Sequence, residues 1–256
     1  MILRRVIEHF RKQEWTAIAL DFLIVVLGVF IGLQVQEWSG RQEDRRRERQ
    51  IVVDMLADLD IDRAQYANGM AYDQRGVAAA SASMRGAGLA PIEFDFRALD
   101  TTVIDYAFDV AALPQTPEDQ LDRLWTYVVI RNFPATSTST YDAMVGAGDI
   151  RIIENRDIVR AIQTYRNRTV SVALQNQKLQ SIRENTLQTG ASYGLATFSA
   201  MPAADYFRLV AGNPGLSAAI RDLATFSIFH YGELRDADAH AAELQDRLRR
   251  YLEEAK

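Results

Sequence analysis

Histidine side chains are the groups of this chain best suited to acid–base or metal chemistry, and their spacing favours neither. The histidines are His9, His230 and His240. No two of them stand four residues apart and no His-Glu-x-x-His motif occurs, so the sequence predicts no metal site. His230 falls on an apolar helical seam near the C-terminus. We expect a hydrogen-bonded core or interface residue there, with a pH-sensing role as the alternative.

Other signatures of catalysis are missing from the sequence. The cysteine count is 0, which excludes a disulfide framework, thiol catalysis and cysteine-ligated zinc. Nucleophile elbows, Walker loops, dinucleotide fingerprints and EF-hand loops do not occur. Asp236, Asp238 and Glu243 are expected to form a solvated helix face near His240, and Gly146-Ala147-Gly148 a turn. We therefore expect no cofactor and, on balance, no enzyme, with an envelope hydrolase as a weaker alternative.

The segment from Trp15 to Trp38 predicts a membrane helix. As an α-helix it rises about 34 Å, against a bilayer hydrocarbon core of about 30 Å. Tryptophan favours the membrane interface, so Trp15 and Trp38 are the expected anchors. A cleaved signal peptide is the alternative, but the apolar run is too long and ends without a small-x-small cleavage site. A buried helix of a soluble core fits the length and the tryptophan pair less well.

Basic residues flank this segment on both sides. Residues 1–14 predict an amphipathic helix on an anionic leaflet, and the basic side chains of both flanks are candidates for lipid headgroup contact. These candidates are Arg4, Arg5, Arg11, Lys12, Arg45, Arg46 and Arg47. A short disordered tail is the alternative for residues 1–14, and a solvated helix face is the alternative for the second group. The positive-inside rule nearly balances, and long domains translocate largely regardless of charge. We therefore expect the N-terminus inside and the soluble domain translocated, which in a bacterial inner membrane places that domain in the periplasm.

Small residues inside the apolar segment indicate helix association. Gly28 and Gly32 form a small-xxx-small pair that lets two helices approach closely, and a lone helix without a partner is the alternative. Gln34 can hydrogen-bond between helices or end the span. Asp21 either pairs within the membrane or lies near its interface. The expected partners are the lipid bilayer, a second copy of the chain and an unidentified membrane or envelope protein. The net charge of −5, spread over both signs, does not indicate nucleic acid.

About 215 residues follow the apolar segment, enough for one domain with its own core. Helical spacing predicts long helices over about 41–83 and 156–189, the second capped by Asn155. Thr116–Asp119 begins a helix that Pro134 ends, and Asn213-Pro214 begins the last helix. The expected fold class is all-α: a single transmembrane helix plus a soluble bundle of long helices. The predicted divisions are 1–14, 15–38, 39–84 and 85–256.

The last helix carries the clearest periodicity. Steps of four and three residues alternate over about five heptads, which predicts a coiled-coil-like seam. The seam comprises Leu216, Ile220, Leu223, Ser227, His230, Leu234, Ala237, Ala241, Leu244, Leu248 and Tyr251. It must face other helices, either of the same chain or of a second copy.

Two blocks of sequence carry a resemblance. Residues 21–38, Ile/Val-rich with glycine and followed by an Arg/Glu run, resemble a family of uncharacterised bacterial single-pass membrane proteins, and residues 141–155 resemble a second block of that family. The resemblance implies an envelope location and no activity. We expect an interaction or scaffold protein acting through self-association and a protein partner. A ligand-binding sensor that signals through a partner is the alternative.

Overall fold

The computed structural model describes residues 15–93, 108–113 and 115–254, with only the backbone described at residues 15–19 and 21. Within these ranges every regular element is helical and there is no strand, so the all-α prediction is confirmed. The chain divides into two compact units, Met1–Gln50 and Ile51–Lys256. The divisions predicted from the sequence, after residues 14, 38 and 84, stay a prediction.

Helix α2 runs from Trp15 to Gly86 and contributes to both units. The segments expected as a membrane helix and a juxtamembrane helix are therefore one element. Its end follows from Gly88, which takes a left-handed φ of 71°. There the amide of Leu89 donates to the carbonyl of Met84 at 2.9 Å and that of Gly88 to Arg85 at 3.1 Å, the two bonds of a Schellman motif.

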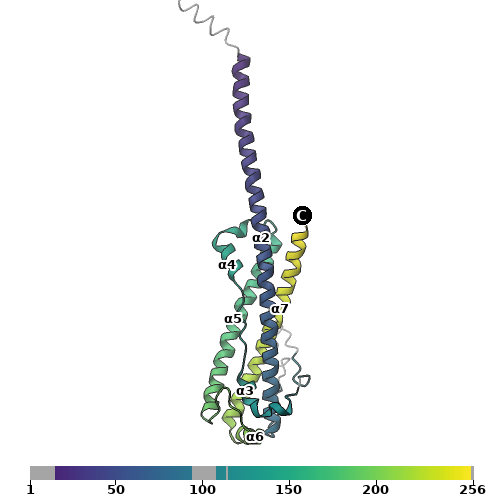
Figure 1. Cartoon of the computed structure of the whole chain (residues 1–256), viewed down its shortest axis with the longest axis vertical. Coiled ribbons are helices and arrows are strands. Elements are labelled where there is room, and N and C mark those ends of the chain that lie inside the picture. Colours follow the sequence, from purple (N-terminus) through teal and green to yellow (C-terminus); the bar gives the residue numbers. More distant parts are fainter. Residues whose placement is uncertain (1–14, 94–107, 114, 255–256) are drawn as a thin grey trace, which may run out of the picture. The chain divides into compact units, whose positions relative to one another are not determined.

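The second unit is a bundle built on the C-terminal part of α2 and on two further long helices, α5 (Arg156–Ala191) and α7 (Pro214–Glu254). In Figure 1, α7 runs back from the α6 end towards the α4 end, and α5 runs the opposite way beside it. The shorter elements lie at the ends of the bundle or on its side. They are η2 (Glu118–Arg123), α3 (Leu124–Val129), α4 (Ser139–Gly146), η3 (Asp149–Arg151) and α6 (Ala203–Gly212).

The apolar core of the bundle has two parts. One surrounds Trp125, Tyr206 and Ile220 and lies towards α3 and α6. The other surrounds Tyr66 and Leu244 and lies towards α4. Each long helix contributes to both parts.

Two helix starts predicted from capping are confirmed, and one helix is shorter than predicted. The Asn155 side chain accepts bonds from the amides of Asp157 at 2.9 Å and Ile158 at 3.3 Å, and α7 begins at Pro214. The helix expected to run to Pro134 begins as the 3₁₀ turn η2 and ends at Val129. Residues 130–138 carry no helix, and in this segment the Pro134 carbonyl accepts from Asn176 of α5 while the Ser137 amide donates to Asp62 of α2. Helix α6 was not predicted.

Candidate functional site

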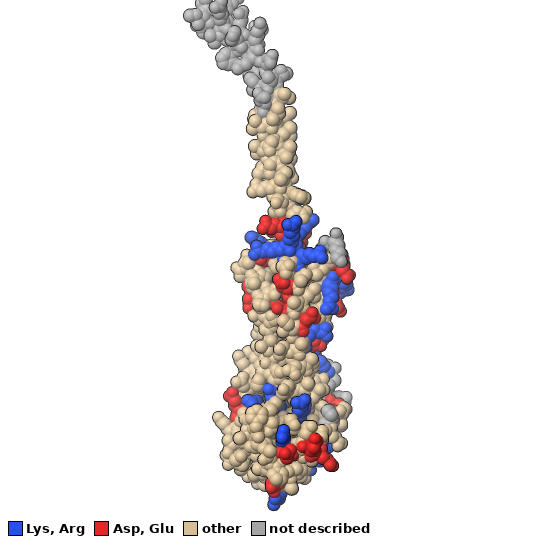
Figure 2. Space-filling view, viewed as in Figure 1, with Lys and Arg blue, Asp and Glu red and all other residues tan. Residues whose placement is uncertain are grey.

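The apolar part of α2 in the first unit has exposed side chains. Phe22 is 70% exposed and Trp38 is 60% exposed, and Figure 2 shows this stretch free of charged atoms before basic and acidic side chains begin. Such surface is unfavourable in water. This part of the helix is long and apolar enough to cross a membrane.

The predicted packing residues of this segment lie open. A Cβ added to Gly28 or Gly32 meets nothing within 4 Å, and the Gln34 side chain is exposed. Arg45, Arg46 and Arg47 are exposed as well. The remaining basic candidates, Arg4, Arg5, Arg11 and Lys12, lie outside the described residues, as does the side chain of Trp15.

The seam of α7 is buried inside the bundle, from Leu216 to Leu248, with only Tyr251 half exposed. Its residues belong to both apolar clusters, where they meet side chains of α2 and α5 of the same chain. The same chain therefore covers this face.

A buried polar layer crosses the bundle at the middle of the seam. His230 Nδ1 lies 2.6 Å from Asp73 Oδ2 on α2, and its Nε2 lies 2.8 Å from Asn176 Oδ1 on α5. The Asn176 amide nitrogen donates in turn to the carbonyl of Pro134 at 2.8 Å. The side chains of His230 and Asp73 are 0% exposed. One imidazole thus links α2, α5, α7 and the segment 130–138.

Arg131 is the cation of this layer, and its side chain is also 0% exposed. Its Nε donates to Ser227 Oγ at 2.9 Å, and its Nη1 donates to the carbonyls of Ile130 and Tyr127 at 2.7 and 3.3 Å. Its Nε is 3.9 Å from Asp73 Oδ1. Burial lowers the pKa of Arg131 to about 10, while Asp73 opposes the change. Carbonyls at the end of α3 therefore share the stabilisation of this charge with Asp73.

Among the described residues, Asp73 Oδ1 and Arg131 Nη2 of the layer find no hydrogen-bond partner. Burial raises the pKa of Asp73, whereas His230 and Arg131 act to lower it. A buried charge with unsatisfied hydrogen bonds is costly. This layer therefore contributes less to the stability of the bundle than a fully hydrogen-bonded network would.

The Asp73–His230 pair resembles the acid–base half of a hydrolase triad, but its surroundings argue against catalysis. In a triad the second imidazole nitrogen faces a hydroxyl or thiol nucleophile. Here Nε2 faces the amide oxygen of Asn176. A pair with 0% exposure also has no contact with a substrate. The arrangement can hold a proton, and it can fix the relative position of three helices.

A second polar cluster fastens the loop before α4 to α2. Tyr165 donates to Asp62 Oδ2 at 2.6 Å, so the 3.0 Å contact between Tyr66 and Tyr165 must be donated by Tyr66. Asp62 Oδ1 accepts from the amide of Ser137 at 2.6 Å. Burial raises the pKa of Asp62, opposed by the bonds from Tyr165 and Ser137.

Asp58 stands one turn before Asp62 on α2 and serves the first turn of α4. Its Oδ2 accepts from the amide of Thr140 at 3.2 Å and from the Ser139 hydroxyl at 3.4 Å. Thr138, at the cap position, makes no side-chain cap bond. The Asp58 carboxylate, from another helix, therefore accepts the bond that an N-cap side chain would accept. No local pattern near residue 140 could have revealed it.

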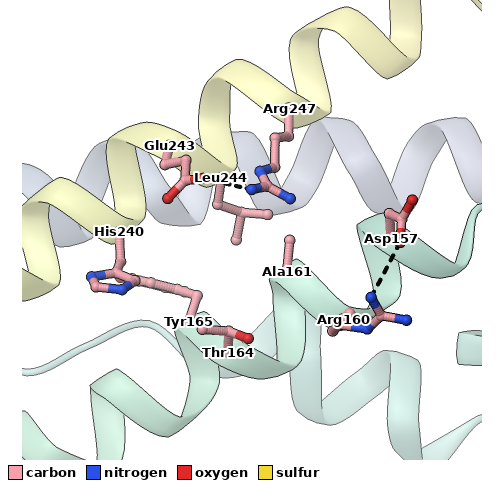
Figure 3. A pocket seen from close by; sticks show the side chains of 9 residues that line it. All are labelled: Asp157, Arg160, Ala161, Thr164, Tyr165, His240, Glu243, Leu244 and Arg247. Atoms are coloured by element: carbon pink, nitrogen blue, oxygen red, sulfur yellow. Dashed lines mark hydrogen bonds and ion pairs between the residues drawn. The ribbon is translucent and has the colours of Figure 1, made fainter.

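A groove of about 210 Å³ lies between α5 and α7 (Figure 3). Asp157 and Arg160 form an ion pair of 3.4 Å on α5, and Glu243 and Arg247 form one of 2.5 Å on α7. His240 lies at another part of the groove and donates from Nδ1 to the carbonyl of Asp236 at 2.8 Å. Each arginine is already neutralised by a neighbouring acid, so the groove has room for a small polar solute without an excess of charge to attract one.

The acidic residues near His240 do more than face solvent. Asp238 pairs with Arg63 of α2 at 2.8 Å, and Asp236 pairs with Arg168 of α5 at 3.2 Å. These two acids are partly exposed, and they also form ion pairs with helices distant in sequence, which the sequence did not indicate. Among the described residues no group of three His, Asp or Glu side chains could hold a metal ion.

The chain matches no protein-family model, no curated protein and no solved structure.

Proposed function

We propose that this protein is a membrane-anchored helical scaffold of the bacterial envelope, which acts through self-association and through contact with a protein partner. The observation that carries the proposal is the exposed apolar stretch of α2, which continues as one helix into the bundle. A bilayer provides the apolar environment that this stretch lacks in water. The soluble bundle lies in the periplasm, since long domains translocate largely regardless of flanking charge.

Self-association is placed in the membrane segment. Because the α7 seam is covered within the chain, it is not free to bind a second copy. Gly28 and Gly32 have open space on their face of the helix, and helices in lipid associate through such small residues. The arginines after Trp38 would then lie beside the lipid headgroups, where guanidinium groups can bond to phosphate oxygens.

Two measurements test this function. The full-length protein should remain in the membrane fraction through carbonate washing, and release into the soluble fraction would refute the anchor. In detergent, wild-type protein should crosslink as an oligomer, and Gly28→Ile with Gly32→Ile should abolish the crosslink. Gly40→Ile is the matched control, since Gly40 also has nothing within 4 Å but lies beyond Trp38. A wild type that is monomeric at all concentrations removes self-association.

A sensor is the second candidate, and the groove between α5 and α7 favours it. A small polar ligand bound there would contact both helices and bias their packing. A thermal-shift screen with small polar metabolites separates the two functions. A reproducible shift that Arg247→Ala removes favours the sensor, and a flat response favours the scaffold.

A further inference from the structure

The polar layer divides the core of the bundle at one level on all three long helices. On α2 it falls between Tyr66 and Val77, which belong to different apolar clusters. On α7 the clusters part on either side of His230, and on α5 on either side of Asn176. Among the described residues, this layer is the only place where one imidazole joins all three long helices through its hydrogen bonds.

The direction of its hydrogen bonds sets the number of protons. The carbonyl of Pro134 can only accept, so the Asn176 amide nitrogen faces it and the Asn176 oxygen faces His230. His230 Nε2 must then carry a hydrogen. The contact of 2.6 Å between His230 Nδ1 and Asp73 Oδ2 needs a second hydrogen. A neutral imidazole beside a carboxylate supplies only one of the two.

Charged groups on several of the elements packed around His230 act on the His230–Asp73 pair. Asp73 faces His230 from α2, and Glu233 interacts with it from α7. Arg131 lies beside Asp73, and Arg183 of α5 acts on Arg131. Arg183 donates to the carbonyl of Val129 at 2.6 Å, as Arg131 does to Ile130 and Tyr127. Carbonyls at the end of α3 therefore share the arginine charges with Asp73, whose Oδ1 lies 3.9 Å from Arg131 Nε while its Oδ2 contacts the imidazole.

We propose that His230 and Asp73 together hold one proton more in the folded bundle than in the unfolded chain, which makes the polar layer a proton-operated latch between α2, α5, α7 and the segment 130–138. Loss of that proton sets two lone pairs against each other, at either Asp73 or Asn176, and one of the two links opens. Burial also raises the pKa of Asp73, in agreement with a proton retained by the pair.

The sign of the pH dependence follows from the unfolded state. A free aspartate titrates near 3.9 and a free histidine near 6.5, so above about pH 6.5 the unfolded chain has lost the second proton. The stabilisation from the latch is complete below about pH 6.5 and is lost as the pH rises until the folded pair titrates. In that window the folding equilibrium constant falls by up to about tenfold per pH unit, the value for one proton.

Nitrogen NMR of the full chain in nanodiscs tests the proton directly. In a His9→Gln, His240→Gln background His230 is the only histidine, and at pH 7.5 both of its ring nitrogens should have the shifts of protonated nitrogens, or one should share its proton with Asp73. A ring nitrogen with the shift of a free lone pair would overturn the proposal.

Asp73→Asn tests the latch by stability. An amide at residue 73 can donate to Nδ1, so a neutral imidazole with hydrogen on Nε2 satisfies both links without the extra proton. Denaturant unfolding of the wild type should show the tenfold-per-unit loss between pH 6.5 and 8.5, and Asp73→Asn should lose that slope. Asp238→Asn, an equal change at a partly exposed ion pair, should keep that slope.

A wild type whose stability does not change between pH 6.5 and 8.5 would refute the latch. Equal slopes in the wild type and Asp73→Asn would refute it as well. Burial raises the pKa of Glu233 too. Glu233 is present in both the wild type and Asp73→Asn, so its effect on the pH dependence of stability drops out of the comparison between them.

Discussion

Replacement of Gly190 by alanine should destabilise the bundle although alanine is the better helix former. A Cβ added at Gly190 would lie 2.2 and 2.4 Å from two atoms of the Trp125 ring. Carbon atoms in good contact are about 3.5–4.0 Å apart, so the ring or the helix must move by more than about 1 Å. Trp125 is 2% exposed and cannot swing into solvent. Its rigid ring also cannot bend away as a longer aliphatic side chain would.

The magnitude is a balance of two effects. Overpacking a core costs about 1–3 kcal/mol. The gain from replacing glycine in a helix is at most about 1 kcal/mol, and Gly190 stands next to the last residue of α5. We expect a net loss of about 1–2 kcal/mol, which for a domain of this size lowers Tm by about 2–8 °C.

The assay is thermal and denaturant unfolding followed by tryptophan fluorescence. Trp15→Phe and Trp38→Phe leave Trp125 as the only tryptophan, so its emission reports on the bundle. The matched control is Gly215→Ala in the first turn of α7, where an added Cβ meets nothing within 4 Å. That variant should be neutral or slightly more stable.

A double-mutant cycle tests the cause. A Trp125→Phe background, followed by circular dichroism, removes the ring atoms that an alanine at residue 190 would strike, so Gly190→Ala should cost less there than in the wild type. If Gly190→Ala raises Tm as much as Gly215→Ala does, or if its cost is unchanged in the Trp125→Phe background, the overpacking argument is wrong.

Leu223→Ala should cost about 2–5 kcal/mol in urea unfolding, because Leu223 is 0% exposed in the core, and a loss below 1 kcal/mol would contradict that packing. Burial acts to raise the pKa of Asp58, but bonds from Thr140, Ser137 and Ser139 outweigh it and hold the pKa low. Its stabilisation is therefore complete above about pH 4, the range of a free aspartate, and is lost below it as the pH approaches the lower folded pKa. The stability difference between wild type and Asp58→Asn should shrink as the pH falls below about 4, and a difference independent of pH would refute the role. A reporter active only in the periplasm should work when fused after Lys256, and activity of a cytoplasm-only reporter there would mean that Arg45–Arg49 set the opposite topology.

Local signals in the sequence were sufficient for the all-α class and for several helix ends. The apolar run up to Trp38, the cap at Asn155 and the proline at residue 214 each act through neighbours a few residues away. The heptad pattern likewise placed His230 on a buried face, because side-chain burial on a helix follows its period. These features need no knowledge of which helix packs against which.

The partners of the buried polar groups came only with the tertiary structure. Asp73 lies 157 positions from His230 and Asp62 lies 103 from Tyr165, so no spacing rule joins them. The bonds that Arg131 and Pro134 make across the bundle, to Ser227 of α7 and from Asn176 of α5, likewise follow no local pattern. Periodicity decides which face of a helix is buried, while the identity of each partner depends on the order in which distant segments pack, and that is a property of the whole chain.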